Sequence, residues 1–230
     1  MTNIAIIPAR GGSKRIPRKN IKDFFGKPII AYSIEAALNS GVFDEVMVST
    51  DDIEIAEIAK KYGAKIPFFR SSELSNDMAM TAPVLVEVLN EYKKLGNEFE
   101  YGCCIYPCAP FINPEKLKEG LESMKEKKVD NAVPVVQFSY PIQRALKIEN
   151  NQLSMILPEN MNMRSQDLMP TYHDIGQYYC FKIESFLAEP TLFSKNTVPI
   201  ITPESQVQDI DTEEDWEIAE IKYKMLKRFL

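Results

Sequence analysis

Short apolar runs alternate along this chain with longer stretches that have helical spacing. Residues 3–7 form an apolar run typical of a buried strand, and the runs at 45–50 and 101–106 predict two more strands. Between the first two runs, at 28–40, apolar residues recur every three or four positions, which predicts an amphipathic helix. The order strand, helix, strand therefore begins at the start of the chain.

The same signals, together with capping residues, place the other elements. Further strands are expected at 65–69, 131–138, 177–183 and 197–202, and further helices at 52–63, 81–95, 113–127 and 212–228. Pro134 interrupts an expected strand, which favours an edge or a bulge there. Thr212 and Asp215 have the spacing of a capping box. The last helix should bury a stripe made of Trp216, Ala219, Tyr223, Leu226 and Leu230.

Alternating strands and helices predict an α/β fold, in which a mostly parallel sheet is covered by helices. We expect a single domain over residues 1–230. Ligands of such sheets bind beyond the carboxyl ends of the strands. This rule points to the loops at 8–20, 50–52 and 107–113 and to the stretch around Asp209.

Residues 139–170 depart from this pattern. Several prolines and the turn pair Asn150-Asn151 predict a hairpin-rich excursion from the main sheet. So short a segment cannot bury all of its apolar residues, which include Tyr140, Leu153, Met155, Ile156, Leu157, Met161 and Met163. Because an exposed apolar arm usually marks an interface, we expect a homodimer.

Charge and composition limit the classes of partner that this protein could bind. The formal net charge is −6, whereas nucleic-acid surfaces need basic stripes, so no nucleic-acid partner is expected. No apolar run approaches the roughly 18 residues of a membrane span, and the first residues lack the features of a signal peptide. The four cysteines have no zinc-site spacing. We therefore expect a cytoplasmic protein that does not contact membranes.

The loop after the first strand, residues 8–20, carries five cationic residues among thirteen. Gly11 lets the backbone approach a ligand and present N–H groups. Arg10 can hold a phosphate through two parallel bonds, while Lys14 and Lys19 act as point charges. The loop lacks the Gly-Lys-Ser/Thr of a Walker loop. It suits a triphosphate, and its alternative is a solvated basic turn.

Asp209 and Asp211 flank Ile210 in an apparent strand, which would place both carboxylates on one face. Mg²⁺ usually takes one or two carboxylates together with phosphate oxygens, so the pair suits a magnesium site. The alternative is a solvated entrance to the helix that follows.

The pattern Pro8-Ala9-Arg10-x-x-Ser13-Lys14-x-x-Pro17-x-Lys19-Asn20 resembles the signature of the CMP-sugar-acid synthetases, a family of cytidylyltransferases. The resemblance runs over nearly the whole chain. It includes Ser49-Thr50-Asp51, Phe69-Arg70-x-x-Glu73-Leu74-x-x-Asp77, Pro107-x-x-Pro110-Phe111 and Asp209-Ile210-Asp211-Thr212-Glu213-x-Asp215. Within the family, residues 164–177 most resemble the branch that activates pseudaminic acid.

This resemblance implies a Rossmann-like nucleotide-diphospho-sugar transferase fold with a small dimerisation arm at 139–170. It also implies that the chain transfers CMP from CTP to a nonulosonic acid. Loop chemistry and resemblance together assign nucleotide binding to Arg10, Gly11, Ser13, Lys14, Lys19, Asn20 and Arg70. Catalysis is assigned to Arg10, Lys19 and Asp211, and Mg²⁺ binding to Asp209 and Asp211.

The sugar acid needs a partner for its carboxylate, and a guanidinium such as that of Arg164 suits it. The alternative for Arg164 is an ion pair with Asp167, and the alternative for His173 is an ordinary surface residue. The expected sugar-binding residues are Arg164, Gln166, Tyr172, His173 and Tyr179.

Several positions depart from residues that the family, or its sialic acid branch, often has: Tyr106, Ile112 and Ile175. They make plain N-acetylneuraminate a less expected substrate, although it and legionaminic acid stay as alternatives. Two other classes of protein share such a sheet. A non-catalytic nucleotide-binding protein would usually lose the basic loop or the acidic pair, and a glycosyltransferase would carry Asp-x-Asp in mid-chain.

Overall fold

The computed structural model describes residues 2–76 and 79–228. Asp77, part of one family motif, and Leu230, expected on the buried stripe of the last helix, lie outside the described residues. Among the described helices, none has the length and apolar character that crossing a bilayer requires.

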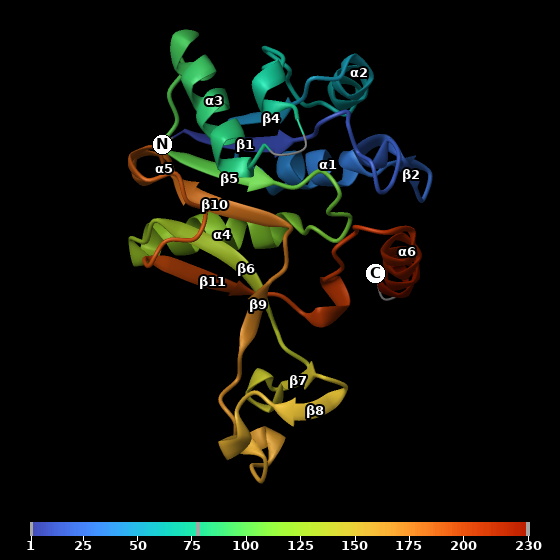
Figure 1. Cartoon of the computed structure of the whole chain (residues 1–230). Coiled ribbons are helices and arrows are strands. Elements are labelled where there is room, and N and C mark those ends of the chain that lie inside the picture. Colours follow the sequence, from blue (N-terminus) through green and yellow to red (C-terminus); the bar gives the residue numbers. More distant parts are fainter. Residues whose placement is uncertain (1, 77–78, 229–230) are drawn as a thin grey trace.

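The main sheet of the described residues has seven strands (Figure 1). Six form a path in the order β11 (Thr197–Ile201), β6 (Asn131–Gln137), β10 (Tyr178–Lys182), β5 (Tyr101–Ile105), β1 (Asn3–Pro8) and β4 (Glu45–Ser49), and β9 (Tyr172–Asp174) pairs with β6. Parallel ladders join β1 to β4 and β5, and β11 to β6. Only β10 and β9 run the opposite way. The mostly parallel mixed sheet is confirmed.

Helices cover both faces of this sheet. They are α1 (Ile30–Ser40), α2 (Ile53–Lys61), α3 (Thr81–Lys94), α4 (Pro114–Lys127) and α5 (Ile183–Ala188), whereas α6 (Glu213–Lys227) packs outside the sheet. Alternate residues of β1 face opposite sides, as strand geometry requires. Ala5 and Ile7 belong to the core cluster that includes residues of α1 and α4, whereas Ile4 and Ile6 pack with residues of α3 and α5.

A third core cluster lies outside the sheet. Trp216 of α6 packs edge to face on Phe24, which belongs to a two-stranded hairpin of β2 (Asp23–Phe24) and β3 (Lys27–Pro28). The capping box of Thr212 and Asp215 is present at the start of α6, as predicted. The last helix is thereby fixed beside the loop that follows β1.

Two expectations about strands need correction. Residues 65–69 form no strand; Lys65 makes a single bridge to Met47, and Pro67 then removes the N–H that a longer ladder needs. Pro134 lies in an interior strand, not at an edge. It falls where one side of β6 changes partner, between the last residue paired with β10, Ala132, and the first paired with β9, Val135.

The excursion at 139–170 projects from the end of the sheet as an arm (Figure 1). It carries a hairpin of β7 (Leu146–Glu149) and β8 (Gln152–Met155), and Asn150 and Asn151 both have positive φ, as the tight hairpin turn requires. Of the seven apolar residues expected to lack burial, six are exposed and Met155 is half-buried. The arm leaves and returns through β6 and β9, which are neighbours.

Candidate functional site

The carboxyl ends of β1 and β5 open onto a cleft of about 470 Å³, which we call the main cleft. Because β10 runs antiparallel, the turn before it reaches the same edge of the sheet. The main cleft is lined by Pro8, Arg10, Ser13, Lys14, Arg15, Lys19, Asn20, Tyr106, Pro107, Cys108, Gly176, Asp209 and Ile210. Three of the four segments that the carboxyl-edge rule selected therefore line one cavity.

The basic loop and the acidic pair meet in this cleft, although they lie at opposite ends of the sequence. Lys19 Nζ donates to the Ile210 carbonyl oxygen at 2.6 Å and lies 3.7 Å from Asp211 Oδ1. Arg15 Nη2 lies 2.9 Å from the same carboxylate oxygen. The side chain of Ile210 is buried, so the carboxylates of its two neighbours, Asp209 and Asp211, are directed away from the core.

The expectation that this pair lies in a strand is wrong, because residues 208–211 belong to no strand or helix. Partial desolvation against the cleft wall raises the pKa of Asp209, and the like charge of Asp211 adds to the rise. A cation between the two carboxylates would relieve that repulsion.

The chemistry of the pair fits Mg²⁺, which binds through one or two carboxylates and completes its shell with water and phosphate oxygens. Among the described residues, no group of three or more His, Cys, Asp or Glu side chains could enclose an ion without such help. A magnesium ion here would therefore depend on the phosphate ligand.

Asn20 lines the cleft and also fixes the loop through hydrogen bonds of its side chain. Its side-chain N–H donates to the Arg10 carbonyl oxygen at 2.9 Å, and its oxygen accepts from Cys108 Sγ at 3.2 Å. Desolvation raises the pKa of Cys108 to about 12, so this thiol stays protonated at neutral pH and acts as a donor. The loops after β1 and β5 are thus joined at the base of the cleft.

Arg70 is not among the residues that line the main cleft. Its guanidinium is buried at the end of β4, where it donates to Ser49 Oγ at 3.0 Å and to the Ser49 carbonyl oxygen at 2.5 Å. Desolvation lowers the pKa of Arg70, although the carboxylates of Asp51 and Glu87 oppose that effect. The nucleotide role assigned to Arg70 stays a prediction.

A second cavity, which we call the adjoining pocket, shares Gly176 and Asp209 with the main cleft. Its other lining residues are Val136, Gln137, Ser139, His173, Asp174, Ile175, Glu204, Val207, Gln208 and Lys222. The His173 ring lies tilted against that of Phe138, with ring centroids 4.7 Å apart, and its Nδ1 lies 2.9 Å from the Asp174 carbonyl oxygen. Of the predicted sugar-binding residues, His173 alone lines this pocket.

The other predicted sugar-binding residues do not line this pocket. Arg164, on the arm, forms the ion pair with Asp167 that the sequence left open, with Nε 2.7 Å from Oδ2. Gln166 and Tyr172 are exposed, and Tyr179 is buried, with its hydroxyl donating to Asp174. Within one chain the arm residues and the two cavities are therefore not brought together.

Sequence reasoning missed Arg15, which lines the main cleft and contacts Asp211. It was counted as a cation of the loop, but the family pattern leaves its position open. Lys222 was also missed, because the apolar stripe of its helix indicated packing and gave no sign of a role for the polar residues beside it. It donates from α6 to the Val207 carbonyl oxygen at 2.7 Å and lines the adjoining pocket.

The sequence of this chain matches a known protein family and several characterised proteins. The family model described as Cytidylyltransferase matches residues 4–212. The pseudaminic acid cytidylyltransferase of Campylobacter jejuni is 46% identical over 98% of this chain and 97% of its own length. The CMP-N,N′-diacetyllegionaminic acid synthase of Legionella pneumophila is 31% identical over 96% and 95%.

A solved structure supports the fold. The structure of a CMP:2-keto-3-deoxy-manno-octonic acid synthetase complexed with CTP superposes with a TM-score of 0.70 over 99% of this chain and 100% of that one, at 18% identity. At that identity the likeness concerns the fold, and it confirms the nucleotidyltransferase architecture that the motifs implied.

Proposed function

The chain belongs to the cytidylyltransferase family, and on that basis we propose that it condenses CTP with a nonulosonic acid to give the CMP-sugar and pyrophosphate. The observation that carries the proposal is the meeting of Lys19 with Ile210 and Asp211, which joins a basic loop to an acidic pair in one cleft. The 46% identity to a pseudaminic acid enzyme over nearly full length supports pseudaminic acid as the sugar.

In the proposed reaction the anomeric hydroxyl of the sugar acid attacks the α-phosphorus of CTP, and pyrophosphate leaves. Arg10, Lys14 and Lys19 line the cleft and would neutralise the charge that gathers on pyrophosphate. Mg²⁺, held by Asp209 and Asp211, would supply further positive charge at the α-phosphate. The task of the chain is alignment and charge stabilisation.

The sugar acid would occupy the adjoining pocket, since that pocket shares its lining residues Gly176 and Asp209 with the main cleft. His173 would contact it there. The exposed apolar arm supports a homodimer in which Arg164, Gln166 and Tyr172 of one copy reach the sugar site of the other. We further place the protein in the cytoplasm, where its four free cysteines would stay reduced.

Pyrophosphate release with CTP, Mg²⁺ and a panel of nonulosonic acids tests this function. We expect release with CTP, preference for pseudaminic acid over legionaminic and N-acetylneuraminic acid, and loss of release in chelator. Asp211→Ala should keep the fold and lose turnover. Preference for another acid would overturn the sugar assignment alone, whereas no release with any acid would overturn the reaction.

The metal assignment has its own check. CTP-dependent binding of Mn²⁺, followed by its magnetic resonance, should be present in the wild type and lost in Asp211→Ala. Equal Mn²⁺ binding by the two proteins would remove Asp211 from the metal site.

A further inference from the structure

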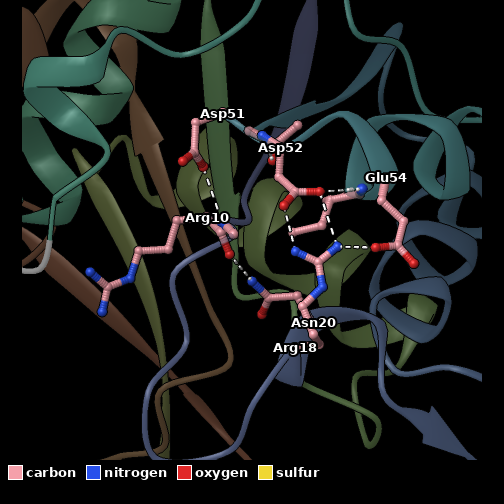
Figure 2. Close-up of polar contacts among 9 residues, drawn as sticks. Arg10, Arg18, Asn20, Asp51, Asp52 and Glu54 are labelled. Carbon is pink, nitrogen blue, oxygen red and sulfur yellow. Dashed lines mark hydrogen bonds and ion pairs between the residues drawn. The ribbon is translucent and has the colours of Figure 1, made fainter.

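One cation of the basic loop does not face the main cleft. The other four line it: Arg10, Lys14, Arg15 and Lys19. Arg18 instead points to the turn that opens α2, and Figure 2 shows its side chain directed there while that of Arg10 points away. The charge of Arg18 is thus directed to protein carboxylates rather than to the cleft.

At that turn the guanidinium forms a two-pronged ion pair with Asp52. Arg18 Nη1 lies 2.5 Å from Oδ2 and Nη2 lies 3.1 Å from Oδ1, and Nη2 also contacts Glu54. The hydrogen bond from Arg18 is the main cause that lowers the pKa of Asp52, so the pair stays ionised at neutral pH. We call Arg18, Asp52 and Glu54 the Arg18 clamp.

The carboxylate of Asp52 also holds two other parts of the structure. Its Oδ1 accepts from the Ile55 N–H at 3.0 Å and so caps α2. Its Oδ2 covers Gly11 so closely that a Cβ built there would lie 2.6 Å away. Asp51 adds a bond, because its Oδ1 accepts from the Gly11 N–H at 3.0 Å. One turn therefore fixes the basic loop near both of its ends.

The backbone at Arg18 supports a positioning role. Arg18 has φ 55°, the left-handed conformation, which is unfavourable for a residue with a Cβ and persists only where its surroundings enforce it. The chain turns there, so that the next two residues, Lys19 and Asn20, face the main cleft. Adjacent residues thus point to opposite sides, one to the clamp and one to the ligand.

We propose that Arg18 is a positioning residue for nucleotide binding: its paired bond to Asp52 fixes the basic loop in the conformation that presents Lys14 and Lys19 to the triphosphate. The inference rests on the proposed function in taking CTP as the ligand. Arg18 itself would touch no substrate. Because a lysine cannot reproduce the planar fork, charge alone at position 18 would not suffice.

The test uses Arg18→Lys, Arg18→Gln, Asp52→Asn and the double variant Arg18→Gln/Asp52→Asn. Asparagine caps helices as well as aspartate, so Asp52→Asn should keep α2. We expect calorimetry to show CTP binding weakened about tenfold in Arg18→Lys, the effect of losing one strong bidentate contact. The double variant should bind CTP no more weakly than Arg18→Gln, because the two residues act as one unit.

Two readouts separate positioning from general stability. The KM for the sugar acid should stay unchanged while that for CTP rises. The matched control is Lys65→Gln, which breaks a pair of 2.7 Å between the exposed Lys65 and the largely buried Glu45 and should leave CTP binding unchanged. Equal CTP affinity in Arg18→Lys and wild type would overturn the proposal.

A CTP-free measurement keeps this inference separate from the proposed function. Hydrogen exchange of residues 10–20 should be faster in Arg18→Lys and Asp52→Asn than in the wild type, with exchange in α4 unchanged. Unaltered exchange in the loop would refute the clamp. A wild type that binds no CTP would refute the function, while the exchange rates would still decide whether the clamp orders the loop.

Discussion

The two glycines of the basic loop differ in the space that surrounds them for an added methyl group. Gly11 lies against the Asp52 carboxylate, whereas a Cβ at Gly12 would meet nothing within 4 Å. Neither glycine has a positive φ, so the difference comes from space and not from backbone conformation. Gly11 thus leaves room for a protein carboxylate, and the nucleotide-binding role that the sequence assigned to it stays a prediction.

Gly11→Ala should therefore push Asp52 out of the Arg18 clamp. Overpacking of this kind costs roughly 1–3 kcal/mol, and we expect weaker CTP binding with it. Gly12→Ala is the matched control and should change stability by no more than about 0.5 kcal/mol. Urea unfolding and CTP titration of both variants measure the contrast, and equal behaviour of the two would contradict the structure.

At the scale of residues, the sequence identified several that line the main cleft, such as Lys14, Lys19 and Asp209, but it missed Arg15 and the contacts that these residues make. Charge and glycine content sufficed to select Lys14 and Lys19, because loops at carboxyl strand ends face ligands. The direction of Arg18 could not be predicted, since it depends on a left-handed residue and on a turn that follows a different strand. Side-chain direction in a loop is set by such distant contacts.

Among the elements, the start of α6 combines a helix cap with the site. Asp215 Oδ2 accepts from the Thr212 N–H at 2.8 Å and from the Asp211 N–H at 3.1 Å. The capping box therefore also orients the backbone of the acidic pair. A helix cap that the sequence predicted for stability thus has a second role that only the structure reveals.

Thr212→Ala should lower stability by about 1 kcal/mol, as the loss of a cap does. It should also lower kcat, because Asp211 loses part of its support. In α4 the capping side chain is that of Asn113, which accepts from the Glu115 N–H at 2.8 Å. Asn113→Ala should therefore cost similar stability without affecting turnover. If both variants kept full kcat, the link between cap and site would be wrong.

Asp130 lies just before β6, at the edge of the sheet opposite the site loops, and joins α5 to the segment before β11. Hydrogen bonds from Ser185 Oγ of α5 and then from Asn196 Nδ2 lower its pKa below the usual value of an aspartate. A lowered pKa contributes stability above the unfolded value, and that contribution is lost as the pH falls through the folded value.

Asp130→Ala should therefore be less stable than the wild type at pH 7, by about 1 kcal/mol at most because the carboxylate is partly exposed. The difference should shrink as the pH falls below about 4, where the wild-type carboxylate gains its proton. Urea midpoints at a series of pH values provide the measurement. A gap that stayed constant down to the acid limit of folding would argue against this account.

Long periodic elements were predictable and short ones were not. The helices at 81–94 and 114–127 follow clear apolar stripes, and the second also begins at a capping residue, Asn113, that is a sequence signal. Strand β9 and helix α5 have three and six residues, too few to show a period. Both are defined by tertiary contacts, β9 by its pairing with β6 and α5 by the packing of Phe186 on Phe181.

At the scale of the whole molecule, the arm exposes apolar residues that a second copy would cover. Ile148 and Leu153 face each other across the hairpin and are 74% and 64% exposed. Such side chains on a projecting hairpin favour association. Leu153 was among the arm residues that the sequence indicated could not all be buried, whereas the exposure of Ile148 comes from the structure.

Ile148→Glu/Leu153→Glu should convert the proposed dimer to a monomer, measured by light scattering at micromolar concentration. CTP binding should persist, because the main cleft lies within one chain, while the KM for the sugar acid should rise. Leu95→Glu, at a residue 59% exposed beyond the end of α3, is the control and should stay dimeric. A wild type that is already monomeric would count against the dimer.

The roots of the arm have a consequence for how such enzymes diversify. Phe138 donates its N–H to the Thr171 carbonyl oxygen at 2.9 Å, so the segment between them starts and finishes at neighbouring points of the sheet. Evolution or a protein engineer could exchange that segment as a cassette with two adjacent junctions, leaving the nucleotide machinery untouched. In the proposed dimer, such an exchange would replace Arg164 and Gln166, the arm residues assigned to the partner's sugar site, without redesigning the chemistry of the main cleft.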